Sequence, residues 1–139
     1  MNRIVHFEIH ATDPSRLMKF YNDVFGWEIK EWSMPGVQLK DENRYWGIMT
    51  APKDSKDPGI NGGMVVRKGS MPKGGEPVSS FVCTIDVSSV DEYLKKIEGA
   101  GGTIALPKMA IPNMAWLAYC KDTDGNLFGI YEEDKNAMN

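Results

Sequence analysis

Hydrophobic residues recur along two helical segments, and both segments follow the i, i+3, i+4, i+7 spacing of one helix face. The first set consists of Leu17, Phe20, Tyr21 and Val24, and the second, seventy-three residues further on, of Val90, Tyr93, Leu94 and Ile97. A period of this length is too long for a solenoid repeat and indicates a duplicated supersecondary module. In a protein made of two such modules, we expect the functional site to lie between them.

Alternation of apolar and polar residues predicts strands around both helices. In residues 4–11, His6, Glu8 and His10 alternate with apolar neighbours, which is typical of a strand with an apolar back and a polar front. The pattern predicts further strands at residues 27–32, 45–50, 60–67, 78–85, 103–106, 115–121 and 127–132. Each half of the chain therefore follows the order β-α-β-β-β.

The predicted helices carry start and stop signals. Asp13 and Pro14 supply an N-cap and a first-turn proline, and Gly26 is placed to end the first helix in a left-handed conformation. The second helix begins with the capping-box sequence Ser89-Val-Asp-Glu92. The polar residues after Asp134 are expected to fray.

The length of 139 residues favours a single domain. We expect this domain to consist of module 1 at about residues 1–67 and module 2 at about residues 76–134. The stretch at residues 68–75, which is rich in glycine and proline, is the expected linker between them.

Composition and charge exclude several classes of protein. The chain is 42% hydrophobic and 25% charged, with a net charge of −3 and a pI of about 5.4, so it lacks the basic character typical of proteins that bind nucleic acid. It has no long apolar run that would span a membrane and no secretory signal. Cys83 and Cys120 lie in separate apolar runs and are expected to be reduced thiols. These features predict a cytoplasmic protein.

Several short motifs occur in an order known from one superfamily. They are His6-Phe-Glu-Ile with Asp13, Phe20-Tyr21, Val24-Phe-Gly-Trp27, Ala100-Gly-Gly102, and Asp122-Thr-Asp-Gly-Asn-Leu-Phe-Gly-Ile130. The chain resembles the vicinal oxygen chelate superfamily, which includes glyoxalase I, bleomycin- and fosfomycin-resistance proteins and extradiol dioxygenases. The resemblance covers nearly the whole chain. It implies an α+β fold in which two tandem βαβββ modules form a half-open, eight-stranded, barrel-like sheet.

The resemblance also implies where a metal would bind, because the metal enzymes of this superfamily place His and Glu ligands on facing strands. The first ligand falls on His6. The second falls on Ser80, or on Phe81 if the register slips by one residue, and the last falls on Gly129. The remaining position falls near Gly62 or Gly63. Since three of the four positions lack a good donor, we expect the full metal site to be missing, and a Zn, Ni, Fe or Mn ion stays an alternative.

The polar front of the first strand has two interpretations. His6 and Glu8 are close enough to contact one ion, whereas His6 and His10 are about 13 Å apart by strand rise, which is too far for joint chelation. The three side chains therefore form either an unusual metal or acid/base site or a polar cluster that lines a cavity. We favour the cavity.

Missing side chains and nearby aromatic residues together predict a ligand pocket. Three glycines, Gly62, Gly63 and Gly129, remove bulk from the expected concave face. Aromatic residues on the strands or their edges would supply apolar walls: Trp32, Tyr45, Trp46, Trp116 and Tyr119. The predicted ligand-binding residues are His6, Glu8, His10, Trp46, Gly63, Trp116 and Gly129.

Three functions remain open at this point. The first is a binding protein that holds a small, partly aromatic molecule in the cup between the modules. The second is a metal-dependent glyoxalase-like lyase or isomerase, or a dioxygenase, in which His6 binds the metal and Glu8 acts as a base or second ligand. The third is metal-free acid/base catalysis by Glu8. A homodimer is expected in each case, because the edge strands of an open sheet favour pairing with a partner.

Overall fold

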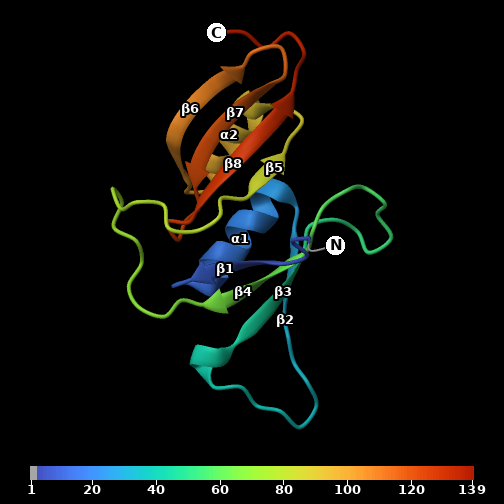
Figure 1. Cartoon of the computed structure of the whole chain (residues 1–139). Helices are drawn as coiled ribbons and strands as arrows, with labels where there is room; N and C mark the ends of the chain where they lie inside the picture. The colour runs from blue at the N-terminus through green and yellow to red at the C-terminus, as the bar shows by residue number, and fades with distance from the viewer. Residues whose placement is uncertain (1–2) are drawn as a thin grey trace. The chain divides into compact units, whose positions relative to one another are not determined.

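The computed structural model describes residues 3–139 and contains both predicted βαβββ modules (Figure 1). The first module consists of β1 (Phe7–Ala11), α1 (Pro14–Phe25), β2 (Glu28–Glu31), the short 3₁₀ helix η1 (Asp41–Asn43), β3 (Tyr45–Met49) and β4 (Gly62–Val66). The second consists of β5 (Thr84–Asp86), α2 (Val90–Gly99), β6 (Thr103–Ile111), β7 (Ala115–Lys121) and β8 (Leu127–Glu133). The chain divides into two compact units between Met71 and Pro72, and each unit is described by itself below.

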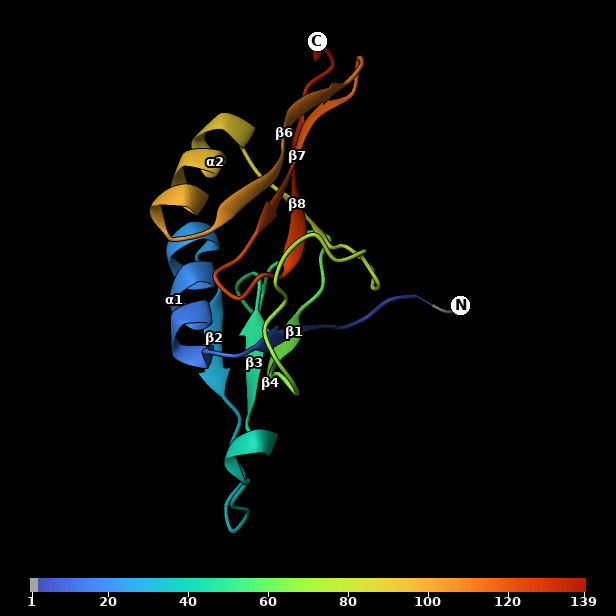
Figure 2. The ribbon, with the colours of Figure 1, turned by 90° about the vertical axis from the view of Figure 1, so that its left-hand side faces the viewer.

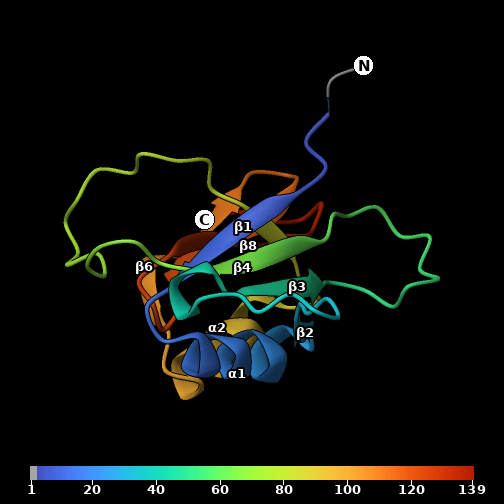
Figure 3. The ribbon, with the colours of Figure 1, turned by 90° about the horizontal axis from the view of Figure 1, so that it is seen from below.

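Both units contain a four-stranded sheet with the same topology. The strand orders are β1-β4-β3-β2 and β5-β8-β7-β6, and in each sheet the first pair is parallel and the others are antiparallel. In the first unit α1 lies along one face of its sheet, as Figure 3 shows. In the second, α2 lies beside β6 and β7 (Figure 2). Each sheet therefore has one face that carries a helix and one face that its own helix leaves open.

The helix signals in the sequence act as predicted. Asp13 accepts a hydrogen bond from the backbone amide of Arg16, Pro14 opens α1, and Gly26 ends it with a φ of 69°. Ser89 caps α2 by accepting from the amide of Glu92. The four predicted positions of α1 are all buried, and Val90 and Ile97 of α2 are buried as well. These apolar faces form the helix-side cores of the two units.

Several segments differ from the prediction, and β6 in particular extends to Ile111 where the pattern predicted a strand only at residues 103–106. The first strand begins at Phe7, and Val5 is 77% exposed, because sheet pairing starts only where Phe7 meets Gly62. The predicted strand at residues 78–85 shrinks to Thr84–Asp86, where the parallel partner β8 is available. The tail is held in place, since Ala137 is buried and accepts a hydrogen bond from the Asn113 amide. None of the described helices is long and apolar enough to cross a membrane.

Candidate functional site

The open face of the first sheet brings together residues from the edge strand β1 and from the two central strands, β4 and β3. Glu8 of β1 pairs with Gly63 of β4, and His10 pairs with Val65. Gly63 and Val65 in turn pair with residues of β3, and Tyr45 is the partner of Val65. Side chains of paired residues lie on the same face of a sheet. Glu8, His10, Val65 and Tyr45 therefore share one surface.

Tyr45 lies across Gly63 and reaches toward the start of β1. A Cβ atom built on Gly63 would lie 2.1 Å from the Tyr45 hydroxyl oxygen, so only glycine fits beneath the ring. The same oxygen lies 3.3 Å from Nε2 of His6, within hydrogen-bonding distance. The bulk that Gly63 removes is thus taken up by an aromatic side chain of the same sheet.

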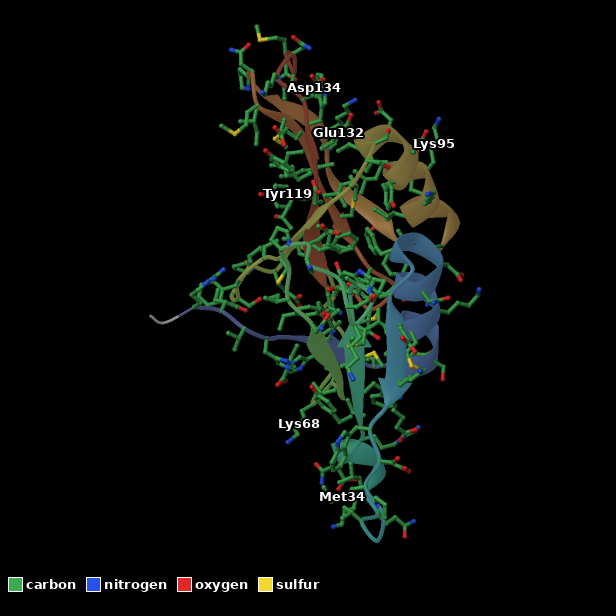
Figure 4. The ribbon with its side chains drawn as sticks, turned by 90° about the vertical axis from the view of Figure 1, so that its right-hand side faces the viewer. Met34, Lys68, Lys95, Tyr119, Glu132 and Asp134 are labelled. Carbon is green, nitrogen blue, oxygen red and sulfur yellow. The ribbon has the colours of Figure 1, made fainter. Side chains whose placement is uncertain are left out.

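A pocket of about 420 Å³ opens beside Tyr45 at the end of the sheet. Its apolar lining residues are Tyr45, Val65 and Val66, of which Tyr45 and Val65 lie on the open face. The polar lining residues are Glu8, His10, Glu42, Asn43, Arg44 and Lys68. The volume falls within the range of sites for small organic molecules. Lys68 lies just beyond the end of β4, as the side-chain view in Figure 4 shows.

The charged residues around this pocket differ in whether they already have a partner within the protein. Arg44 makes two hydrogen bonds with the Glu31 carboxylate, at 2.7 and 2.9 Å, and its guanidinium lies 4.9 Å from the centre of the Trp46 ring. The hydrogen bonds to Arg44 lower the pKa of Glu31, and the same bonds raise the pKa of Arg44. Within residues 3–139, by contrast, the side chains of Glu8, Glu42 and Lys68 form no hydrogen bond or ion pair. These three groups are available to a ligand.

The two tryptophans predicted to line the pocket lie on the helix-side faces of their sheets. Trp46 pairs with Met64, is only 2% exposed, and points away from the face of Tyr45. Trp116 pairs with Glu132, whose carboxylate accepts a hydrogen bond from the Val90 amide at the start of α2.

Further contacts fix Trp116 in place. Its indole NH donates to Asp134 at 3.0 Å, and the ammonium group of Lys108 lies 4.3 Å from the ring centre. Trp46 does not share the open face with Glu8, because the side chains of Tyr45 and Trp46, adjacent on β3, point to opposite faces.

Gly129 occupies the matching place in the second module. It pairs with Thr84 of β5, as Gly63 pairs with Glu8 of β1, and a Cβ atom on Gly129 would lie 2.8 Å from the Thr84 hydroxyl oxygen. In Figure 4, Tyr119, the β7 partner of Gly129, is labelled on the same unit. The space beside this glycine is therefore also filled by its neighbours.

The paired strands also locate the second-module counterpart of His6. Glu8 and Thr84 hold matching register positions, and so do the helix caps Asp13 and Ser89. This register assigns Val82 to the place of His6, whereas Ser80 lies two residues earlier, before β5 begins. The prediction counted back from Asp86 as the counterpart of Asp13, whereas the structure matches Asp13 with the cap residue Ser89, and this moves the position toward the C-terminus. Valine supplies no metal donor.

The residues at the expected metal positions do not fit a metal centre. His6 can donate a ring nitrogen, but Gly63, Val82 and Gly129 have no donor side chain, and stable divalent sites usually need three or more protein ligands. In the part of the chain that the structure describes, no three His, Cys, Asp or Glu side chains gather as a potential metal site. We therefore derive no chemistry through a metal.

Tyr45 was among the aromatic residues expected to supply a wall, whereas most of the other residues that line the pocket were not predicted from the sequence. Glu42 and Lys68 lie in loop-like stretches whose spacing carries no signal, and they join the pocket only because η1 and the end of β4 meet there. Tyr45 lies on a predicted strand, and its alternation with Trp46 shows that the two face opposite ways. The sequence does not show which of the two faces the open side.

Comparison with known proteins agrees with this arrangement of tandem modules. The sequence model of the Glyoxalase/Bleomycin resistance protein/Dioxygenase superfamily matches residues 3–130. Two curated relatives, from Mycobacterium bovis and Mycobacterium tuberculosis, bear the name "Putative glyoxylase CFP32" and are 23% identical over 133 residues. The match covers 93% of this chain but only 45% of each relative, so the chain spans about half their length.

Solved structures show the same fold at low sequence identity. A glyoxalase I mutant from Zea mays matches with a TM-score of 0.68 and 17% identity over 93% of this chain and 44% of that one. A mutant of the fosfomycin resistance protein FosX from Listeria monocytogenes, complexed with Mn(II), matches with a TM-score of 0.65 and 18% identity, covering 94% and 90% of the two chains. The fold defines an α+β protein of two tandem βαβββ modules. The chain belongs to the glyoxalase/bleomycin resistance protein/dioxygenase superfamily.

Proposed function

We propose that this protein binds a small, partly aromatic molecule in the pocket on the open face of its first sheet, without the full metal site of its superfamily. The observation that carries this proposal is the pocket of about 420 Å³ lined by Tyr45, Val65 and Val66. Small-molecule sites combine apolar surface with polar groups that fix the orientation of the ligand. A metal-dependent enzyme that uses His6 and Glu8 is the alternative, and the donorless Gly63, Val82 and Gly129 weigh against it.

The available polar groups support binding of a ligand with polar substituents. Glu8 and Glu42 offer carboxylate acceptors and Lys68 offers a cation, and within residues 3–139 none of the three is engaged. The tyrosine ring supplies a flat apolar surface on which an aromatic ring can pack. His6 contributes through its contact with Tyr45, and His10 through its place in the pocket lining.

Ligand-observed NMR with a set of monocyclic aromatic acids, amines and ketones tests the proposal. Val65→Trp fills the pocket with a larger side chain, and Val78→Trp, at an exposed position outside the pocket, is the matched control. We expect members of the set to bind the unaltered protein and Val78→Trp, and to lose binding to Val65→Trp. Absence of binding throughout the set, or binding that Val65→Trp leaves unchanged, would contradict the proposal.

Two further properties belong to the same proposal. We expect a homodimer, because both sheets end in edge strands that a second chain can pair with, and we expect the protein to act in the cytoplasm. Sedimentation equilibrium at micromolar concentrations tests the first of these expectations, and a monomer under those conditions would contradict it.

A further inference from the structure

One glutamate and one lysine lie at the same end of the pocket without pairing with each other. Glu42 belongs to η1, just before β3, and Lys68 lies just after the end of β4. The antiparallel register that pairs Tyr45 with Val65 brings Glu42 level with Lys68 when it is continued by three residues on each strand. Within residues 3–139 the two side chains form no hydrogen bond or ion pair. A carboxylate and an ammonium group are therefore both available at this end.

The remaining charged side chain at this end of the pocket, Arg44, already has its partners. Its guanidinium makes two hydrogen bonds with the Glu31 carboxylate and lies 4.9 Å from the centre of the Trp46 ring. A bidentate pair of this kind holds the guanidinium in a fixed orientation and satisfies the carboxylate. A ligand at this end of the pocket therefore meets one negative and one positive charge that have no partner within the described chain.

This pair of charges indicates the head group of the ligand. A free α-amino acid carries an ammonium group and a carboxylate group on one carbon atom. Its ammonium group can donate to the Glu42 carboxylate, and its carboxylate can accept from the Lys68 ammonium group. A ligand with only one of the two charges would leave one side chain of the protein without a partner, and complementary charges are what distinguish one ligand from another in such a site.

The rest of the pocket indicates the side chain of that ligand. Tyr45 and Val65 lie next to the charged end on the open face, and the tyrosine ring is held over Gly63, where it offers a flat apolar surface to an aromatic ring. Glu8 is the register partner of Gly63 and lies two residues, roughly 7 Å, further along the sheet than Val65. Its carboxylate is placed to accept a hydrogen bond from the far end of the ligand.

We propose that the pocket binds a free α-amino acid with an aromatic side chain. Glu42 binds the ammonium group, Lys68 binds the carboxylate group, and Glu8 accepts from a hydroxyl group on the ring. This inference rests on the binding site proposed above and names the chemical class of its ligand. It requires no metal and no chemical step.

Isothermal titration calorimetry with four matched compounds tests the assignment. They are L-tyrosine, L-phenylalanine, 3-phenylpropanoate, which lacks the ammonium group, and 2-phenylethylamine, which lacks the carboxylate group. We expect L-phenylalanine to bind at least about tenfold more tightly than either compound with a single charge, because each loses a hydrogen bond between charged groups. We expect L-tyrosine to bind more tightly than L-phenylalanine, because its hydroxyl group reaches Glu8.

Variants separate the roles of the two charged residues. Lys68→Met should lower the affinity for L-phenylalanine at least about tenfold and leave that for 2-phenylethylamine unchanged. Glu42→Gln should lower the affinity for L-phenylalanine to a similar extent and leave that for 3-phenylpropanoate unchanged. Lys95→Met and Glu92→Gln are the matched controls and should change none of these affinities, because both residues are exposed on α2 and neither lines the pocket.

Two further variants locate the ligand within the pocket. Val65→Trp fills the space beside Tyr45 and should abolish binding of L-phenylalanine. Glu8→Ala should remove the preference for L-tyrosine over L-phenylalanine and leave the affinity for L-phenylalanine unchanged. A general loss of folding would lower all the affinities together, so only the expected contrasts between ligands support the assignment.

The outcomes distinguish this assignment from the binding site itself. Equal affinities for L-phenylalanine and its two singly charged analogues would overturn the assignment and leave the binding site in place. The same holds if none of the four compounds binds while members of the wider aromatic set do. Binding of L-phenylalanine that both Lys68→Met and Glu42→Gln leave unchanged would also overturn it. If neither the four compounds nor the wider set binds, the proposed binding site falls together with the assignment.

Discussion

Tyr45 occupies the space that Gly63 leaves open on the neighbouring strand, with its hydroxyl oxygen 2.1 Å from the place of the missing Cβ atom. The glycine therefore has a steric role within the sheet, and the pocket lies to one side of it. At the position where the superfamily resemblance implies a metal-binding residue, this protein holds the ring of a tyrosine that contacts His6.

Gly63→Ala should force Tyr45 away from its position and destabilise the fold. The added methyl group would overlap the phenol at a buried site, and overpacking of this kind typically costs about 1–3 kcal/mol. Urea unfolding measures the loss. Gly99→Ala is the matched control, since it lies in open space at the end of α2 and should be neutral or stabilise by up to about 1 kcal/mol. Equal effects of the two changes would contradict this account.

The double variant Gly63→Ala/Tyr45→Ala should recover part of that loss. Removing the ring removes the overlap, so the two substitutions should couple by about 0.5–3 kcal/mol rather than add. A thermodynamic cycle of the two single variants and the double variant gives this coupling energy. Strict additivity would show that the ring and the glycine do not contact each other in solution.

Removal of metal ions should leave the stability of the protein unchanged. The positions at Gly63, Val82 and Gly129 have no donor side chains, and a ligand that does not bind the folded state cannot stabilise it. We expect the melting temperature after dialysis against a chelator, and after addition of Zn²⁺, Ni²⁺ or Mn²⁺, to stay within about 1 °C. A rise of several degrees with one of these ions that His6→Ala abolishes would restore the metal-dependent alternative.

The two cysteines should differ sharply in reactivity. Cys120 is 0% exposed, and burial, with a smaller contribution from Glu98, raises the pKa of its thiol to about 11, whereas Cys83 is exposed. At pH 8, iodoacetamide should modify Cys83 and leave Cys120 protected, since the thiolate is the reactive form. Peptide mass spectrometry checks the site of labelling, and comparable labelling of Cys120 in the folded protein would contradict its burial.

The raised pKa of the Cys120 thiol makes the free energy of unfolding depend on pH in the alkaline range. The ordinary thiol pKa is 9.0 and the folded value is about 11, so above pH 9 the unfolded chain releases this proton more readily than the folded one. The contribution of Cys120 is therefore fully present below pH 9 and is lost between pH 9 and about 11. Cys120→Ala should remove this part of the pH dependence in urea unfolding, and Cys83→Ala, the control, should retain it.

Asp134→Ala should loosen the segment that follows β8. It removes the acceptor of the Trp116 indole NH and a hydrogen bond to the Asn136 amide. Loss of hydrogen bonds to a charged group typically costs about 1.5–3 kcal/mol. Hydrogen exchange should speed up at the Asn113 amide, which donates to Ala137. Glu133→Gln, at an exposed neighbouring position, should leave exchange there unchanged.

Local signals in the sequence predicted most of the fold. The helix faces, the caps at Asp13 and Ser89, and the left-handed Gly26 depend on residues a few positions apart, so their pattern is visible along the chain. The order β-α-β-β-β followed from the alternation of strands and helices in each half. The ends of β1 and β5 were mispredicted because they depend on where the parallel partner strand begins and ends.

The sequence by itself determined the tandem modules, the superfamily, and the polar front that carries Glu8 and His10, because periodicity and motif order need no long-range information. Only the tertiary structure decided which residues lie beside this polar face of β1. It placed Tyr45 over Gly63, assigned Trp46 and Trp116 to the helix-side faces, and joined Glu42 and Lys68 to the pocket. Alternation along a strand separates the two faces of a sheet, but pairing with other strands determines which residues each face brings together.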